Sequence, residues 1–255
     1  MRTDLAHGVL TLTMNRPHRM NALTANELSV LKEAVDLGSR DHEVRVIVLD
    51  AEGPAFCSGA DLGTAENLAT ADAAADTIDA ANALVEAMTA APKPVVTLVR
   101  GAAAGVGVPI ALAGDLIMCD HSAYFMLAFT RIGLMPDGGS SALVAASVGR
   151  SRAMRMALLA ERLSAADALA AGLVTHVEEA SAFERVAADV VKRLADGPQV
   201  ALRLTKHAVN EATLAALPGA FAREREGQLG LLLAPDFNEG ARAFREKRSA
   251  QFSDR

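Results

Sequence analysis

The feature that most constrains this chain is a short apolar run that enters a glycine-rich turn, at residues 95–115. The run begins with the letters VVTLV, and its β-branched residues predict a buried strand. Gly101, Gly105 and Gly107 follow among alanines, and residues 108–113 then predict the start of a helix. The first N–H groups of a helix have no partner inside it, and the helix dipole adds partial positive charge there. The stretch predicts either a site for a negatively charged oxygen or a turn that needs glycine only for close packing.

A second glycine-punctuated loop, residues 52–62, follows another predicted strand at residues 44–49. In a parallel α/β sheet the loops after the strands lie along one edge, and ligands bind there. We therefore expect the backbone N–H groups of Ala60 and Val106 to converge on one oxygen. Two such donors are worth roughly 2.7–4 kcal/mol each when negative charge develops on that oxygen. This arrangement would suit a thioester whose carbonyl becomes an enolate.

Composition excludes several classes of protein. The 255 residues are 51% hydrophobic, which is enough for one sizeable core, with or without a helical appendage. A net charge of −6 and only 4% aromatic residues argue against nucleic-acid binding. No run of eighteen apolar residues predicts a membrane span, and the first residues lack a signal-peptide pattern. Cys57 and Cys119 have neither disulfide-scaffold nor metal-ligand spacing, so we expect a cytoplasmic protein without a metal site.

Local patterns predict strands that alternate with helices over the first two thirds of the chain. The predicted strands are residues 8–14, 44–49, 95–99, 116–119 and 123–125. Thr24 and Glu27 form a capping-box pattern that opens the first helix, and residues 64–90 are alanine-rich and helical in pattern. Short helices are predicted at residues 142–148 and from Ser164 onward. This order predicts an α/β fold with a largely parallel sheet, although no internal sequence repeat is visible.

The last third of the chain is helical in pattern after one further predicted strand at residues 173–177. An apolar run at residues 229–233 would remain partly exposed in a monomer. We therefore predict an α/β core at residues 1–195 and a helical oligomerisation region at residues 196–255.

Seven motifs occur along the chain in a fixed order. They are NRP with MNAL at 15–23, AFCSGADL at 55–62, KPVV at 93–96, the stretch 101–115, IGLMPDGG at 132–139, AAGLV at 170–174 and EGARAFREKR at 239–248. Each motif alone is weak, but in this order they resemble the crotonase superfamily of enoyl-CoA hydratases and isomerases over nearly the whole chain. The resemblance implies a spiral of ββα repeats with a C-terminal all-helical region, and a homotrimer or dimer of trimers. It also implies an acyl-CoA thioester substrate, no cofactor other than the coenzyme A of that substrate, and an oxyanion hole at Ala60 and Val106.

The sequence departs from the family pattern at the two glutamates that hydratases use to add water. Pro109 and Phe129 occupy the matching positions, and neither side chain can move a proton. The resemblance places both in the acyl pocket instead. Val106 is a further departure, because glycine is usual there, and its side chain narrows the space beside the thioester.

Asp137 is the carboxylate that stands out near the predicted site. The surrounding segment resembles the ring-epoxide phenylacetyl-CoA isomerases and the Δ3,Δ2-enoyl-CoA isomerases, in which one Asp or Glu at this turn shuttles a proton. Such a group removes a proton α to the thioester and returns it two carbons further on, which typically contributes 10²–10⁴-fold in rate. The alternative is that Asp137 only caps the helix that begins near Gly138, because Asp is a preferred N-cap residue.

The resemblance also indicates residues that contact coenzyme A. These are Arg19, Ala22, Leu23, Asp61, Leu62 and, in the C-terminal helix, Lys247. The alternative for Asp61 is a structural carboxylate that accepts from nearby backbone N–H groups, and the alternative for Lys247 is a surface lysine. Three functions remain open: an isomerase that uses Asp137, a non-catalytic acyl-CoA-binding protein, and a hydratase or hydrolase with an unusual base.

Overall fold

The chain is built from a recurring order of two strands and one helix. The computed structural model describes residues 1–61 and 71–254. The recurring units are β1 (Arg2–Ala6), β2 (Val9–Met14), the 3-10 turn η1 (Pro17–Arg19) and α1 (Ala25–Arg40); β3 (Val46–Ala51), β4 (Ala55–Cys57) and α2 (Ala71–Ala90); β5 (Val95–Val99), β6 (Ala102–Ala104) and α3 (Gly107–Leu112); and β7 (Leu116–Asp120), β8 (Tyr124–Met126), the 3-10 turn η3 (Ala128–Ile132) and α4 (Ser140–Leu159). The rest is β9 (Leu163–Ser164), α5 (Ala165–Ala170), β10 (His176–Glu178), α6 (Ala180–Ala195), α7 (Gln199–Thr213), α8 (Leu217–Leu232) and α9 (Pro235–Glu246).

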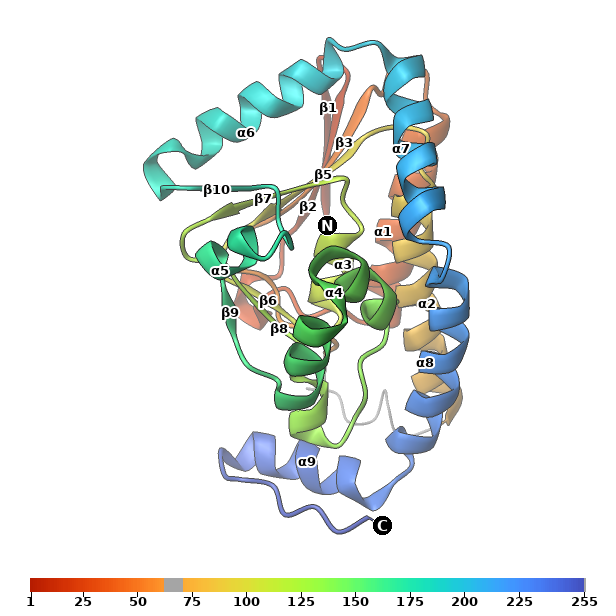
Figure 1. Ribbon diagram of the computed structural model, residues 1–255, viewed down its shortest axis with the longest axis vertical. Helices are drawn as coiled ribbons and strands as arrows, with labels where there is room; N and C mark the ends of the chain where they lie inside the picture. Colours follow the sequence, from red (N-terminus) through yellow and green to blue (C-terminus); the bar gives the residue numbers. More distant parts are fainter. Residues whose placement is uncertain (62–70, 255) are drawn as a thin grey trace.

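Each unit after the first adds one strand to each of two sheets. A six-stranded sheet has the order β1-β2-β3-β5-β7-β10, and a four-stranded sheet has the order β4-β6-β8-β9. All pairs are parallel except β1–β2 and β8–β9. The chain therefore advances as a spiral, in which the strands of each unit pair with strands of the unit before (Figure 1).

The strand side chains alternate between two buried layers, as the period of two in a strand requires. In β3, Ile47 and Leu49 belong to the large core that the helices on one face cover. Val46 and Val48 point to the other face and pack with Phe183 of α6, which lies across that face of the sheet (Figure 1). Because both faces are covered, the central strands consist of nearly continuous apolar residues.

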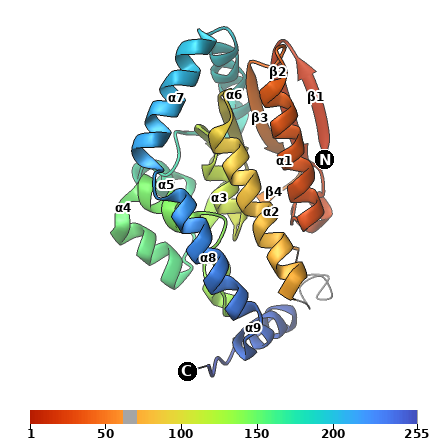
Figure 2. The same ribbon diagram turned by 90° about the vertical axis from the view of Figure 1, so that its right-hand side faces the viewer.

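The C-terminal helices pack against the core. α8 runs beside α2 and also contacts α4, while α9 packs against η3 (Figure 2). A Cβ on Gly240 of α9 would lie 2.5 Å from the Cα of Ile132, so this helix approaches the η3 backbone closely. Leu217, Leu232 and Phe237 of these helices are part of the large buried cluster.

Several local predictions are confirmed, and four strands were missed. Thr24 Oγ1 accepts from Glu27 N at 3.3 Å while Glu27 Oε2 accepts from Thr24 N at 2.8 Å, which completes the predicted capping box. The three-residue strands β4 and β6 lie in segments that the sequence predicts as loops, and β1 and the two-residue strand β9 were not predicted. The predicted helix at residues 64–90 is observed from Ala71 onward, and residues 64–70 lie outside the described part. No helix among the described residues is long and apolar enough to cross a membrane.

Candidate active site

The two glycine loops meet at the site, because β4 pairs in parallel with β6 and each loop continues from one of these strands. A Cβ on Gly107 would lie 2.5 Å from the Cys57 carbonyl oxygen, and a Cβ on Gly105 would lie 3.5 Å from the Gly59 Cα. Gly105 also has a φ of 53°, a conformation that favours glycine. Close backbone packing therefore accounts for Gly107, and the positive φ accounts for Gly105.

The same loops also leave two backbone donors unused. No acceptor in the described chain takes the N–H of Ala60 or of Val106, although the neighbouring Asp61 N donates to Leu23 O. Val106 directly precedes α3, where the N–H groups have no partner inside the helix. Both Ala60 and Val106 line one cavity. The geometry is thus compatible with packing and with anion binding at once.

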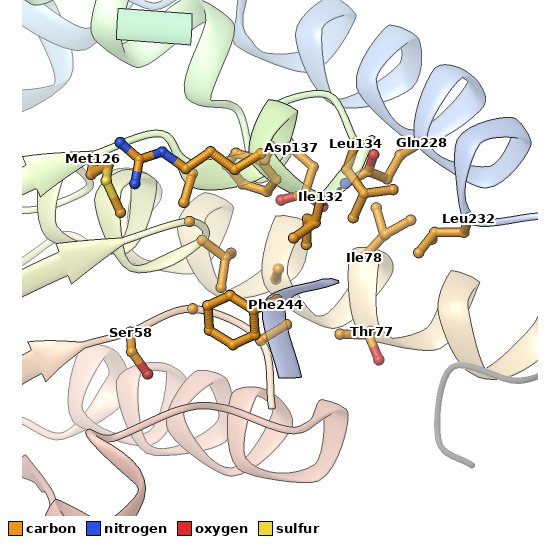
Figure 3. Close-up of a pocket in the computed structure, with 18 of the residues that line it drawn as sticks. Ser58, Thr77, Ile78, Met126, Ile132, Leu134, Asp137, Gln228, Leu232 and Phe244 are labelled. Carbon is orange, nitrogen blue, oxygen red and sulfur yellow. Dashed lines mark hydrogen bonds between the residues drawn. The ribbon is translucent and has the colours of Figure 1, made fainter. Parts of the chain in front are cut away.

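The cavity has a volume of about 220 Å³, and its walls are largely apolar. Ile78 of α2, Leu134, Leu232 of α8 and Phe244 of α9 surround it (Figure 3). Phe129 is also part of the lining. The wall is therefore assembled from segments distant in sequence, and it suits an apolar group.

Of the two glutamate positions, only the one held by Phe129 faces this cavity. Pro109 is buried in α3 and is not among the residues that line the cavity. Its Cγ lies 2.9 Å from the position of a Cβ on Gly138, so it packs behind the turn that carries Asp137. Val106 Cγ2 lies 3.3 Å from the same position.

Asp137 is a buried carboxylate in the cavity wall (Figure 3). Its Oδ2 accepts from Gln228 Nε2 at 2.9 Å, while its Oδ1 is buried without a hydrogen-bond partner in the described chain. Burial raises the pKa of Asp137 to about 7, the hydrogen bond from Gln228 opposes this rise, and the charge of Glu224 adds to it. Asp137 can therefore both lose and accept a proton near neutral pH.

The side chain of Asp137 does not cap α4, so that alternative is wrong. The N-terminal backbone groups of this helix, Gly139 N and Ser141 N, donate to the two carboxylate oxygens of Glu224 at 2.7 and 2.8 Å. Asp137 contributes only its backbone carbonyl, which accepts from Ser140 N at 3.2 Å. Its side chain is thus left for another role.

A model of the enoyl-CoA hydratase/isomerase family matches residues 4–255. The chain belongs to this family.

Some relatives within the enoyl-CoA hydratase/isomerase family are named hydratases, and others are named isomerases. A probable enoyl-CoA hydratase of Rhodobacter capsulatus is 39% identical, over 100% of this chain and 98% of that protein. A 1,2-epoxyphenylacetyl-CoA isomerase of Escherichia coli is 36% identical, over 96% of this chain and 95% of that protein. The crystal structure of an enoyl-CoA hydratase from Mycobacterium avium subsp. paratuberculosis is 49% identical with a TM-score of 0.93, over 99% of this chain and 98% of that one. The predicted crotonase-like spiral with a helical C-terminal region is confirmed.

The sequence did not indicate Glu224 and Gln228 of α8 as part of the site of this family member. A signal for them exists, because they fall in the buried stripe of α8 with Leu217, Ala220 and Leu232. Polar residues at buried positions of an amphipathic helix are unusual unless they have a partner. Here the partners are the α4 N-terminus and Asp137.

The residues expected at coenzyme A lie in and after η1, in the first glycine loop and after α9. Arg19 is exposed at the end of η1, whereas Ala22 and Leu23 are buried. Leu23 N donates to Gly59 O at 2.9 Å, so this segment is joined to the first glycine loop. Asp61 Oδ2 accepts from Arg16 Nη2 at 3.0 Å, which gives the carboxylate a structural ion pair.

Lys247 and Leu62 are the two further residues expected at coenzyme A. Lys247 is exposed and follows α9 in the left-handed conformation, so it lies just after the C-terminal helix and not in it. Leu62 lies outside the described residues.

Proposed function

We propose that this member of the enoyl-CoA hydratase/isomerase family is an enoyl-CoA isomerase in which Asp137 carries the proton. The carboxylate removes a proton from C2 of a 3-enoyl-CoA, and the electron pair of that C–H bond moves towards the thioester oxygen. The N–H groups of Ala60 and Val106 stabilise the resulting dienolate. Asp137 then returns the proton to C4, and the product is a 2-enoyl-CoA with no net change in atoms.

The observation that carries this proposal is the state of the Asp137 carboxyl group. It lies in the cavity wall, its Oδ1 has no hydrogen-bond partner among the described residues, and its pKa is raised to about 7. A proton shuttle must be basic enough to take a proton and acidic enough to return it, which a pKa near the working pH allows. One carboxylate is sufficient for isomerisation, because no water is added.

Hydration receives less support from the same geometry. A hydratase of this family uses two acids, and Pro109 and Phe129 occupy both positions. Among the described residues, Glu224 is the other carboxylate whose charge acts on Asp137, but both of its oxygens accept from the α4 N-terminus. A hydratase mechanism would therefore have to act through Asp137 alone.

The proposed substrate is an acyl-CoA thioester with an apolar acyl group. The largely apolar cavity wall supports an alkyl or aryl chain. Asp61 lies in the first glycine loop and Leu23 is hydrogen-bonded to it, and these two residues, with Arg19, Ala22 and Lys247 after α9, would hold coenzyme A. We propose a homotrimer or dimer of trimers as the assembly.

Replacement of Asp137 by Asn tests the proposed isomerase. We expect kcat on a 3-enoyl-CoA to fall by at least roughly 10²-fold, because Asn cannot shuttle a proton. Affinity for a saturated acyl-CoA, measured by calorimetry, should barely change, since the backbone donors are untouched. Asp120→Asn is the matched control, because Asp120 is a buried carboxylate outside the cavity that accepts from Ser122 N; its turnover should be retained.

Three results would overturn the proposal. Full turnover by Asp137→Asn would exclude Asp137 as the shuttle. Loss of 2-enoyl absorbance with addition of water, and no isomerisation of a 3-enoyl-CoA, would favour a hydratase. Tight binding of every thioester without turnover would favour a non-catalytic binding protein.

A further inference from the structure

We propose that Gln228 is a positioning residue that confines the proton of Asp137 to a single oxygen, Oδ1. The proposal rests on the proposed isomerase for its catalytic meaning, but its structural content concerns only the protonation of Asp137. Gln228 lies on α8, it is buried, and 91 residues of chain separate it from Asp137.

The hydrogen bonds fix the orientation of the Gln228 amide. Gln228 Oε1 accepts from Met135 N at 3.2 Å. A backbone N–H only donates, so the amide atom that faces it must be the oxygen, and the other terminal atom must be the NH₂ group. That NH₂ group lies 2.9 Å from Asp137 Oδ2 (Figure 3).

This orientation decides where the proton resides. An NH₂ group cannot accept a hydrogen bond, so Asp137 Oδ2 must act as the acceptor in both protonation states. A neutral Asp137 therefore carries its proton on Oδ1, the buried oxygen that has no partner in the described chain. If Gln228 were absent, the carboxyl group would be free to place its proton on either oxygen.

The charged groups around Asp137 are few. Glu224 lies one turn before Gln228 on α8, and its charge opposes ionisation of Asp137. Arg131 of η3 lines the same cavity, and its Nη2 donates to Ala160 O at 2.9 Å. The described residues that α2, α9 and the glycine loops contribute to the cavity wall are not titratable. Gln228 therefore supplies a neutral stabilising contact to the ionised carboxylate, which keeps its pKa from rising further.

A pair of variants separates this role from simple packing. Gln228→Met has a similar volume but loses both hydrogen bonds, whereas Gln228→Glu keeps an acceptor for Met135 N and replaces the NH₂ donor by a second acid. Both variants should raise the pKa of Asp137 by at least about 1. Each removes the neutral donor, and Gln228→Glu also adds a like charge. Gln199→Met is the matched control, because Gln199 donates to backbone carbonyls at the C-terminal end of α6 and just after it, namely Leu194 O and Gly197 O.

The first measurement is a ¹³C NMR titration of protein labelled at the aspartate carboxyl carbon. The Asp137 signal is assigned by its absence in Asp137→Asn. We expect its midpoint to move upward in both Gln228 variants and to stay unchanged in Gln199→Met. An unchanged midpoint in both Gln228 variants would overturn the proposal, even if the protein proved not to be an isomerase.

The second measurement is the pH profile of kcat and KM on a 3-enoyl-CoA. We expect about a tenfold lower kcat for Gln228→Met at neutral pH, a KM within about twofold of wild type, and an acidic limb displaced upward in pH. If Gln228→Glu kept wild-type activity while Gln228→Met lost it, the hydrogen bond from Met135 N would account for the whole role of Gln228. That result would contradict the proposal. Absence of turnover in the wild type would instead refute the proposed isomerase, and the titration would still decide the role of Gln228.

Discussion

At the scale of the residue, Asp137 imposes a stability cost that depends on pH. Its carboxyl group is buried and its pKa rises from 3.8 to about 7, so the native state holds the proton over a pH range in which the unfolded chain has released it. Stability is therefore greatest below pH 3.8 as far as this group is concerned, and is lost as pH rises towards 7. The full loss is on the order of 4 kcal/mol at most.

Asp137→Asn should remove this dependence, because Asn has no charge to bury. We expect the variant to gain stability relative to wild type at both pH values, with a clearly larger gain at pH 8 than at pH 5, where only part of the loss has occurred. Thermal unfolding at both pH values, at one protein concentration, measures the difference. A wild-type advantage that grows from pH 5 to pH 8 would contradict the burial argument.

Residue by residue, the sequence predicted Asp137 but not its neighbours, for a physical reason. Asp137 belongs to a local turn motif, which can be read from a few adjacent letters. Gln228 and Glu224 act on that turn across 91 and 85 residues. Their contacts depend on how α8 packs, which no local pattern reports. The alternative of Asp137 as a cap failed for the same reason, since a distant carboxylate fills that role.

At the scale of the element, α4 depends on a carboxylate that another helix supplies. Its N-cap, Gly139, has no side chain to accept from the first N–H groups, and Glu224 accepts from both Gly139 N and Ser141 N. Glu224→Ala should therefore leave two donors without this acceptor and lower the free energy of unfolding by about 1–3 kcal/mol.

Glu226→Ala is the matched control, because Glu226 is exposed on the same helix and its loss should cost little. Urea unfolding of both variants, at equal protein concentration, measures the difference. Equal effects of the two substitutions would mean that the cap contributes nothing to stability.

The elements that the sequence missed lack the signals that prediction uses. β6 consists of three alanines, which carry no β-branched or aromatic pattern, and all five residues of β1 are exposed. The helix predicted at residues 142–148 is observed as the first part of α4, which has a kink at Gly149, a residue with a φ of 74° and a ψ of 163°. By contrast, β5 and α1 were predicted because an apolar run and a capping box are local features.

At the scale of the whole molecule, the spiral is a structural repeat without a visible sequence repeat. Each unit meets different neighbours, since its first strand enters one sheet and its second strand enters the other, except in the first unit. Different neighbours require different side chains, so no period survives in the sequence. Family resemblance, not periodicity, was therefore what allowed the ββα spiral to be predicted.

The apolar run at residues 229–233, which motivated the predicted assembly, is largely used within the chain. Leu232 is buried and lines the cavity, and Leu229 and Leu231 pack against the core, so Leu233 is the leucine of the run that remains exposed. The run alone is therefore weaker support for an oligomer than the sequence indicated.

Other exposed apolar side chains support the proposed trimer or dimer of trimers. Val200 and Leu204 lie one turn apart on α7 and are 63% and 56% exposed. A protein with such surface gains by covering it with a second copy. We expect light scattering at micromolar concentration to give three or six times the chain mass of 26.5 kDa. Leu204→Glu should lower that mass by placing a charge in the contact, whereas Leu37→Glu, at an exposed leucine of α1, should retain it. A wild-type mass of 26.5 kDa would show that the chain is a monomer and would refute the proposed assembly.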